Sequence, residues 1–377
     1  MHELGADVNL VVCQKSKLQD WINHFNDYYD LHIYDLTKHL DEFLAECEPK
    51  VGIINYDLIW RRKKISKLKD FTLMLDESSL IQHENTNRTK CIMGMNPKNV
   101  ILLSGTPTGG KYELLLSQMH LLGWKIKEDL FWNQYVDWEW NETTDGYWER
   151  KILGYKNVER LKRKMREHGC IFLKTDEVMD LPEQIHQTIK VPISKDYKTF
   201  KKEDYIEIDG VELAGDCTLT KLLYERQICG LYSTDKLNAF ADLIESTEDR
   251  IIVFYNFTAE MERLKAIASE LGKTCGVVNG EVKEQNIIEQ DGAILFVQYQ
   301  AGAMGLNLQK ANKIIYYTPP LSSELFEQSK KRIHRIGQKN TCFYYYLTMD
   351  NTVEVSIYNL LAKRKDYTED LFKQERL

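Results

Sequence analysis

The sequence predicts an α/β protein in two halves, each with a parallel sheet flanked by helices. Short apolar segments alternate with longer helical ones, and the same pattern is found in both halves of the 377 residues. Each apolar run is continuous, as expected for a strand that is covered on both faces. The length also suits two domains of ~100–200 residues each. We therefore expect one domain over residues 1–170 and a second over residues 171–377.

Each half contains four apolar runs that predict strands and at least one stretch that predicts a helix. In the first half, strands are expected at Leu10–Cys13, Val51–Asn55, Phe71–Leu75 and Val100–Leu103, and a helix at Lys17–Tyr28. In the second half, strands are expected at Ile251–Tyr255, Thr274–Val278, Ala293–Val297 and Lys313–Tyr317, and a helix at Ala259–Leu271. Between the halves lies a tryptophan-rich segment over residues 132–148, followed by a basic helix around Arg160–Arg166.

Composition and charge exclude several classes of protein. Hydrophobic residues make up 43% of the chain and charged residues 28%, which excludes a wholly disordered or collagen-like chain. No apolar run is long enough to span a bilayer, and the first residues do not resemble a signal peptide, so no membrane contact is expected. The 8 cysteines are scattered without Cys-x-x-Cys spacing, which indicates buried thiols in a reducing cytoplasm. A net charge of −7 excludes a basic DNA-coating protein but still allows one local basic face.

Two adjacent carboxylates follow one of the expected strands. Phe71–Leu75 runs directly into Asp76 and Glu77. The carboxyl ends of parallel strands face the ligand crevice, where two acids can divide their work. One can hold Mg²⁺ through water, while the other orients or deprotonates an attacking water. Alone the pair is weak evidence, because Asp-Glu after a strand also serves as the start of a helix.

A second motif, Ser104-Gly105-Thr106-Pro107, follows the next expected strand. At this point the sequence resembles the Swi/Snf-type branch of the superfamily-two helicase-like ATPases, in a compact bacterial or phage form. In that family a strand ending in Asp-Glu (motif II) precedes one ending in Ser-Gly-Thr-Pro (motif III). Further segments resemble family motifs in the same order: residues 10–21 (motif Ia), 52–57 (a strand ending like Thr-Tyr-Glu), 252–257 (motif IV), 302–308 (motif V) and 328–338 (motif VI).

The resemblance implies two RecA-like lobes that bind ATP and Mg²⁺ between them and act as a motor on double-stranded DNA in the cytoplasm. It also implies roles for single residues. Asp76 would hold Mg²⁺ through water, Glu77 would position or activate the attacking water, and Arg335 would be the arginine finger with Arg332 as its companion. Gly305 and Gln338 would line the nucleotide cleft. Contacts with the nucleic-acid backbone are implied for Lys15, Ser16, Asn55, Tyr56, Ser104, Thr106 and Gly302.

The arginines of motif VI also have a physical rationale of their own. Arg332 and Arg335 are three residues apart, so on a helix they would share a face. A guanidinium is always charged and forks onto phosphate oxygens. In isolation, the run Lys330 to Arg335 is more simply a solvated basic helix. The collinear order of the other motifs favours the functional interpretation.

The family's phosphate loop, Gly-Lys-Thr or Gly-Lys-Ser before motif Ia, is not found at that position. Gly272-Lys273-Thr274 follows a helix and precedes a strand, the reverse of the required order, and Gly109-Gly110-Lys111 is followed by a tyrosine. We expect the first lobe to be incomplete at its N-terminus, as in a shortened product of a longer gene that hydrolyses ATP inefficiently alone. The alternatives are a loop supplied by another chain, or a non-hydrolysing module that binds nucleic acid or a partner.

Basic and aromatic segments leave two interpretations open. The basic runs Arg61–Lys69 and Arg160–Arg166 fit solvated helix faces better than phosphate contacts. The tryptophans of residues 132–148 are expected to pack in a core, although aromatic rings can also stack on bases.

Overall fold

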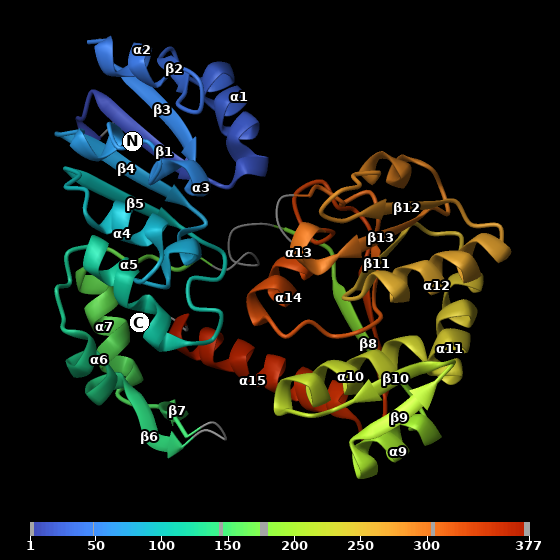
Figure 1. Ribbon diagram of the computed structural model, residues 1–377. Coiled ribbons are helices and arrows are strands. Elements are labelled where there is room, and N and C mark those ends of the chain that lie inside the picture. Colours follow the sequence, from blue (N-terminus) through green and yellow to red (C-terminus); the bar gives the residue numbers. More distant parts are fainter. Residues whose placement is uncertain (1–3, 48, 143–145, 174–179, 303–305, 373–377) are drawn as a thin grey trace. The chain divides into compact units, whose positions relative to one another are not determined.

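The computed structural model describes residues 4–47, 49–142, 146–173, 180–302 and 306–372. The chain divides into two compact units, one formed by Met1–Phe172 with Asp366–Leu377 and the other by Leu173–Lys365. We call them unit 1 and unit 2. Each contains one parallel sheet with helices packed on it, which confirms the predicted fold class (Figure 1). No helix in the described ranges has the length and apolar character needed to cross a membrane.

The sheet of unit 1 has five strands in the order β2-β3-β1-β4-β5, and every neighbouring pair is parallel. Its strands are β1 (Val8–Cys13), β2 (His32–Asp35), β3 (Lys50–Asn55), β4 (Phe71–Asp76) and β5 (Asn99–Leu103). The four strands predicted in this half are all present. The edge strand β2 was not predicted, because none of its residues is buried and it therefore lacks an apolar run.

Helices cover both faces of this sheet. The helix α1 (Leu18–Tyr28) packs Phe25 against Val11, Val51 and Met74 on one face. The opposite face is covered by α2 (Leu40–Ala45), α3 (Tyr56–Ile59) and α4 (Asn87–Met93). Burial on both sides explains why the central strands are apolar at most of their positions.

A smaller helical cluster completes unit 1. It consists of α5 (Leu116–Leu121), α6 (Glu128–Tyr135) and α7 (Val158–Glu167), which bury Phe131, Leu161 and Met165 between them. The basic run Arg160–Arg166 lies on α7 as predicted, but Arg61–Lys69 forms turns and a short 3-10 helix rather than a helix face.

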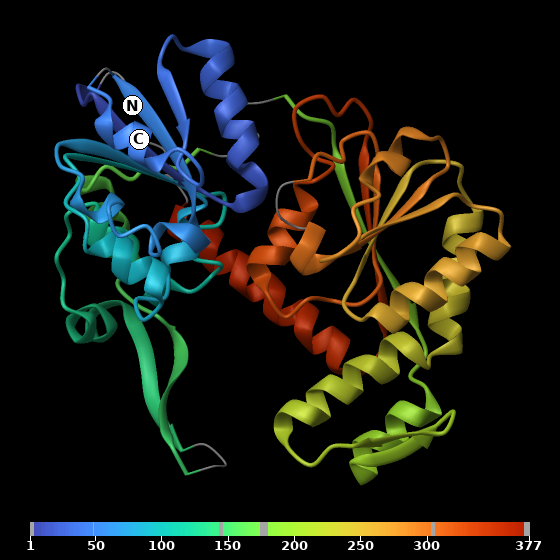
Figure 2. The ribbon, with the colours of Figure 1, turned by 45° about the horizontal axis from the view of Figure 1, so that its top comes forward.

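The tryptophan-rich segment forms an antiparallel hairpin of β6 (Val136–Glu142) and β7 (Trp148–Tyr155). Figure 2 shows this hairpin extending away from the helices of unit 1. Trp140 and Trp148 are 57% and 63% exposed, so the prediction of core packing is wrong for them. Trp132 and Trp138 are half-buried. A two-stranded ribbon has no second layer to cover it, and the sequence pattern does not reveal that absence.

The sheet of unit 2 has six strands in the order β12-β13-β11-β14-β15-β8, all parallel. Its strands are β8 (Gln184–Val191), β11 (Ile251–Tyr255), β12 (Cys275–Val278), β13 (Ile294–Gln298), β14 (Lys313–Tyr316) and β15 (Cys342–Met349). The four predicted strands are again present. Two strands were not predicted: the edge strand β8, which is exposed at most of its positions, and the inner strand β15, whose buried and partly buried residues alternate over its first half.

Helices cover both faces of this sheet as well. One face packs against α11 (Thr234–Glu245) and α12 (Thr258–Glu270), and the other against α13 (Tyr299–Gly302), α14 (Ser323–Lys330) and α15 (Val353–Phe372). A third cluster joins α9 (Lys195–Glu203), α10 (Thr218–Leu231) and the hairpin of β9 (Tyr205–Ile208) and β10 (Val211–Ala214). It packs against Met349 at the end of β15 and so belongs to unit 2.

Candidate functional site

The two acidic residues lie where β4 ends, at the carboxyl edge of the sheet in unit 1. Asp76 is the last residue of β4, and both Asp76 and Glu77 are half-buried. Glu77 has a φ of 58° and a ψ of 59°, the left-handed conformation that favours glycine. Such a conformation costs a non-glycine residue ~1–3 kcal/mol and is found most often at functional sites. The strain singles out Glu77 on this edge.

Two aromatic side chains hold Asp76 in place. The indole Nε1 of Trp21, on α1, donates a hydrogen bond to Asp76 Oδ2 at 2.9 Å. The hydroxyl of Tyr56 donates to the carbonyl oxygen of Asp76 at 2.9 Å and lies 3.4 Å from that of Glu77. The Asp76 carboxylate is therefore oriented by a neutral donor. Trp21 belongs to the segment that resembles motif Ia, but the sequence alone did not suggest this contact.

Glu77 is linked to the end of the neighbouring strand. The hydroxyl of Ser104, directly after β5, donates to Glu77 Oε1 at 2.8 Å. Ser79 donates to the same oxygen at 3.3 Å. The two predicted motifs thus meet through a side-chain hydrogen bond, although 27 residues separate Glu77 from Ser104.

The turn that begins at Ser104 is held by amide side chains. The carbonyl oxygen of Pro107 accepts hydrogen bonds from Gln82 Nε2 at 3.1 Å and Gln118 Nε2 at 2.8 Å. Gln118 in turn accepts a hydrogen bond from the buried Ser78 at 2.9 Å. The segments that follow β4 and β5 are therefore tied to each other and to α5.

The acidic edge is electrostatically negative. Burial, with a contribution from the charge of Asp76, raises the pKa of the Cys13 thiol to about 12. Burial and then the charges of Asp76 and Glu77 raise the pKa of Tyr56 well above its usual value. Tyr56 therefore stays a protonated donor over the whole physiological range, and the edge favours cations.

The donor set suits Mg²⁺ that arrives with a nucleotide. Among the residues that the structure describes, no three His, Cys, Asp or Glu side chains gather to hold a metal alone. Magnesium bound with ATP needs only one or two carboxylates, since phosphates and waters fill its other positions. Two buried oxygens near this edge, Asn55 Oδ1 and Thr106 Oγ1, have no hydrogen-bond partner in the described part of the chain. Unpaired buried polar atoms are typical of a place that takes water or a ligand.

The residues predicted to contact nucleic acid differ in exposure. Lys15 and Ser16 are exposed on a short 3-10 helix (Lys15–Lys17) directly after β1. Asn55, Tyr56 and Thr106 are buried. Ser104 is half-buried against Glu77, and Gly302 is the last residue of α13. Lys15 and Ser16 are thus the members of this set whose side chains reach solvent at the end of a central strand.

The arginines of motif VI do not lie on a helix, so that prediction is wrong. The helix α14 ends at Lys330, and Arg332 and Arg335 occupy the turns that follow. Ile333, between the two arginines, is completely buried in the core of unit 2. The two arginines still converge, because NH1 of each approaches the carbonyl oxygen of Leu306, at 3.3 and 3.5 Å.

Motif VI also contacts motif V through side chains. Arg335 donates a hydrogen bond to Asn307 Oδ1. Gln338, expected to line the cleft, makes hydrogen bonds with the backbone of Gln309, Ala311, Ile333, Lys339 and Asn340. Its amide therefore helps to hold this loop. Gly305 lies outside the described residues.

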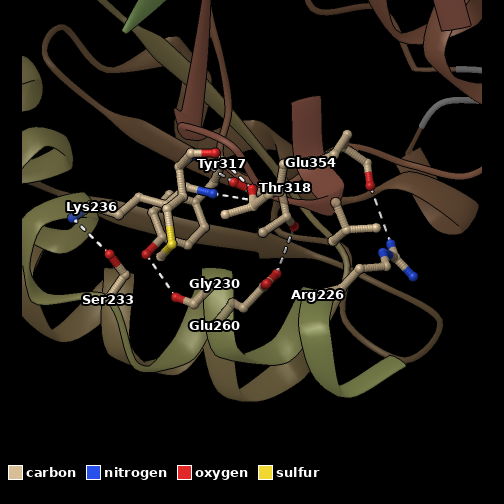
Figure 3. A network of polar contacts seen from close by, with 12 residues as sticks. Arg226, Gly230, Ser233, Lys236, Glu260, Tyr317, Thr318 and Glu354 are labelled. Carbon is tan, nitrogen blue, oxygen red and sulfur yellow. Dashed lines mark hydrogen bonds and ion pairs between the residues drawn. The ribbon is translucent and has the colours of Figure 1, made fainter. Parts of the chain in front are cut away.

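A buried polar network supports the motif IV residue Asn256 in unit 2. Figure 3 shows Glu260 of α12 meeting Thr318, with Gly230 of α10 beside it. Glu260 Oε2 accepts hydrogen bonds from the backbone amides of Asn256 and Phe257 and from the Thr318 hydroxyl, at 3.0–3.2 Å. Asn256 Nδ2 donates to Thr318 and to the Pro319 carbonyl. The loops that follow β11 and β14 are thereby held together.

The helices around this network approach very closely. A Cβ atom added at Gly230 would overlap the carboxylate of Glu260, so only glycine fits there. Burial raises the pKa of Glu260 to about 7, against the opposing effect of the backbone amides and of Lys236. Nearby, Lys236 and Glu354 form an ion pair whose side chains are 0% and 1% exposed.

Comparison with known proteins finds two family matches. Residues 4–232 match the SNF2-related domain, and residues 235–337 match the helicase conserved C-terminal domain. The first match ends well after the boundary between the units at Phe172 and Leu173. The segment that includes α9 and α10 therefore matches with the first half in sequence but packs with the second half in the structure.

Curated proteins of similar sequence have names that share the term SWI/SNF or helicase. The chain is 22% identical over 380 residues to the "SWI/SNF-related matrix-associated actin-dependent regulator of chromatin subfamily A-like protein 1 homolog" of Caenorhabditis elegans, covering 95% of this chain and 54% of that protein. It is also 22% identical over 399 residues to an uncharacterized ATP-dependent helicase of Mycoplasma genitalium, covering 95% of this chain and 36% of that protein. The chain thus spans about half the length of these relatives, or less.

One solved structure is also similar. It is the "Sulfolobus solfataricus SWI2/SNF2 ATPase core in complex with dsDNA", at 18% sequence identity and a TM-score of 0.42, covering 98% of this chain and 83% of that chain.

Proposed function

The chain belongs to the SNF2-related family, and on that premise we propose that it is an ATP-driven, helicase-like motor that acts on double-stranded DNA. The observation that carries the proposal is the hydrogen bond from Ser104 to Glu77. It joins the motif after β5 to the strained acid after β4, so a movement of either strand end would displace the other. Coupling of this kind is what a motor needs between its nucleotide site and its track.

We propose that Asp76 and Glu77 divide the chemistry of ATP hydrolysis between them. Bound Mg²⁺ and ATP would supply the phosphoryl group that is transferred to water. Asp76, oriented by Trp21, would hold the metal through water, and Glu77, oriented by Ser104, would take the proton of the attacking water. Neutral donors support this division, because they orient both carboxylates without removing their charge.

Arg335 would stabilise the charge that develops on the transferred phosphoryl group, with Arg332 as its companion. Their shared contact with Leu306 supports a common role, because it keeps both guanidinium groups in one loop. Gly305 and Gln338 remain predicted to line the nucleotide cleft. Mutational effects test this scheme once a phosphate loop has been supplied: Arg335→Ala and Glu77→Gln should each remove most of the turnover gained, and the double variant should be little worse, since groups that act as one unit are non-additive.

DNA would bind through its phosphates, with little dependence on sequence. Lys15 and Ser16 are the best-supported contacts because both are exposed at the end of a central strand. Fluorescence anisotropy with labelled duplex DNA tests this: affinity should fall steeply with salt, and Lys15→Glu should weaken binding several-fold. Lys198→Glu, the same charge change on the exposed face of α9, is the matched control. Binding that is flat with salt would contradict the DNA proposal.

No Gly-Lys-Thr or Gly-Lys-Ser precedes the segment that resembles motif Ia, where the family's phosphate loop is expected. We propose that these 377 residues alone turn ATP over negligibly, because the loop that holds the phosphates is not found at that position. The same observation favours the alternative, a module that binds DNA or a partner without hydrolysis. Supplying the loop separates the two: the motor gains DNA-stimulated turnover that depends on Glu77, and the module does not.

A further inference from the structure

The hairpin of β6 and β7 carries an exposed row of aromatic side chains that the proposed function does not use. Side chains at alternate positions of a strand share a face, and cross-strand partners share it too. The register therefore places Trp138, Trp140 and Glu142 of β6 together with Ile152, Arg150 and Trp148 of β7. We call these six residues the tryptophan face. Its two outer rings, Trp140 and Trp148, are 57% and 63% exposed.

The inner part of this face already binds a cation from its own chain. The guanidinium of Arg150 lies 4.8 Å from the ring centroid of Trp132, on α6, and 5.0 Å from that of Trp138. The same guanidinium forms ion pairs with Glu128 and Asp129, at 3.8 and 2.8 Å. Tryptophan rings with carboxylates beside them attract cations. Arg150 thus demonstrates the chemistry that the outer rings can offer to a partner.

The segment that carries the tryptophan face is acidic, and its carboxylates are divided between the two faces of the hairpin: Glu142 lies on the tryptophan face, whereas Glu139 and Glu149 lie on the opposite face. In the described part of residues 128–155, carboxylates outnumber cations by four, with Glu128, Asp129, Asp137, Glu139, Glu142 and Glu149 against Arg150 and Lys151. Both cations are paired within the segment, Arg150 as above and Lys151 with Glu139 at 2.9 Å. The excess negative charge repels phosphates and attracts cationic side chains.

We propose that the tryptophan face docks an arginine- and lysine-rich segment of a partner protein. Cationic side chains of that segment stack on Trp140 and Trp148, and Glu142 lies beside them on the same face. Tryptophan and arginine are over-represented among the residues that dominate protein interfaces. The acidic surroundings disfavour nucleic acid at this position. The proposal does not depend on ATP hydrolysis.

The test uses the full chain and a short fluorescein-labelled peptide of alternating arginine and glycine. Anisotropy titrations should show that Trp140→Ala with Trp148→Ala weakens binding by about tenfold or more, with a smaller loss for the two Phe substitutions. Glu142→Lys should weaken binding independently, by adding a like charge. Trp60→Ala is the matched control, because Trp60 is also exposed, at 37%, and has Arg61 stacked on its ring at 4.9 Å.

Four results would overturn the proposal. The first is unchanged peptide binding in the double alanine variant, because that variant keeps the net charge and would reveal general electrostatic attraction. The second is an equal loss in Trp60→Ala. The third is a short single-stranded oligonucleotide that competes with the peptide in a Trp140-dependent manner. The fourth is self-association of the chain through this face, seen by sedimentation as a tryptophan-dependent change in mass. If the double alanine variant unfolds, peptide binding by the double phenylalanine variant and by Glu142→Lys tests the proposal.

Discussion

The two units use carboxylates in opposite ways. Unit 1 keeps Asp76 and Glu77 half-buried at the edge of its sheet, where neutral donors, Trp21 and Ser104, bind them. Unit 2 buries Glu260 and Glu354 completely. Glu260 accepts two backbone amides and a hydroxyl, and Glu354 is paired with Lys236.

This contrast separates carboxylates that are available for chemistry from those that hold the fold. A neutral donor orients a carboxylate and leaves its charge in place, so Asp76 and Glu77 can still attract a cation. A buried lysine neutralises the charge of its carboxylate partner. Complete burial of a glutamate disfavours its ionised form. Residue type alone therefore does not identify the candidate catalytic acids. Their partners and their burial do.

The largest effect is expected from breaking the ion pair in unit 2. Lys236→Met leaves Glu354 buried without its cation, which should lower the free energy of unfolding by ~3–5 kcal/mol. Urea denaturation followed by circular dichroism measures this. The double variant Lys236→Met with Glu354→Leu should recover much of the loss, since two apolar groups leave no uncompensated charge. A loss no smaller in the double variant would show that shape, not charge, dominates there.

The next effect depends on pH and concerns Glu260. Its pKa is about 7 in the folded protein and near 4.5 when unfolded, so the folded state binds more protons between these values. Stability from this group is therefore present at low pH and is lost as pH rises from about 4.5 to about 7. Glu260→Gln does not titrate, so its stability relative to the parent should rise across that range by up to ~3 kcal/mol.

Thermal or urea unfolding of both proteins at a series of pH values tests this prediction. Glu77→Gln is the matched control, because it makes the same substitution at a half-buried position in unit 1. A difference between the Glu260 variant and its parent that does not change between pH 5 and pH 8 would contradict the linkage.

A smaller effect is expected for the donor that holds the backbone of the acidic pair. Tyr56→Phe removes a buried hydroxyl that binds the Asp76 carbonyl, which should lower the free energy of unfolding by ~1 kcal/mol. Tyr34→Phe, which loses a longer hydrogen bond to Glu46 at a less buried hydroxyl, is the comparison and should change stability less. Equal effects of the two substitutions would mean that the Tyr56 contact does not hold the edge.

The smallest effect on stability is expected at the candidate catalytic acid itself. Asp76→Asn keeps an oxygen that can accept the Trp21 hydrogen bond, so the free energy of unfolding should change by less than ~0.5–1 kcal/mol. Measured under the same conditions as Lys236→Met, it sharpens the contrast between the two kinds of carboxylate. A loss comparable with that of Lys236→Met would place Asp76 among the structural acids instead.

Much of the fold could be predicted because the central strands are buried on both faces. Continuous apolar runs such as Phe71–Leu75 and Ile251–Tyr255 marked these strands correctly. Apolar runs also marked the edge strands β5 and β12, but they missed the exposed edge strands β2 and β8 and the inner strand β15. The position of Asp76 and Glu77 at a sheet edge also followed from order along the chain, because they come directly after a strand.

Local sequence determined the order of the predicted strands and motifs along the chain. It thereby placed the acidic pair and Ser104 directly after strands. Tertiary structure alone decided which side chains meet: Trp21 with Asp76, Ser104 with Glu77, and both arginines of motif VI with Leu306. It also decided that Ile333 enters the core and that Trp140 and Trp148 stay exposed. The physical reason is that burial and hydrogen-bond partners depend on residues far away in the sequence, which periodicity and spacing do not encode.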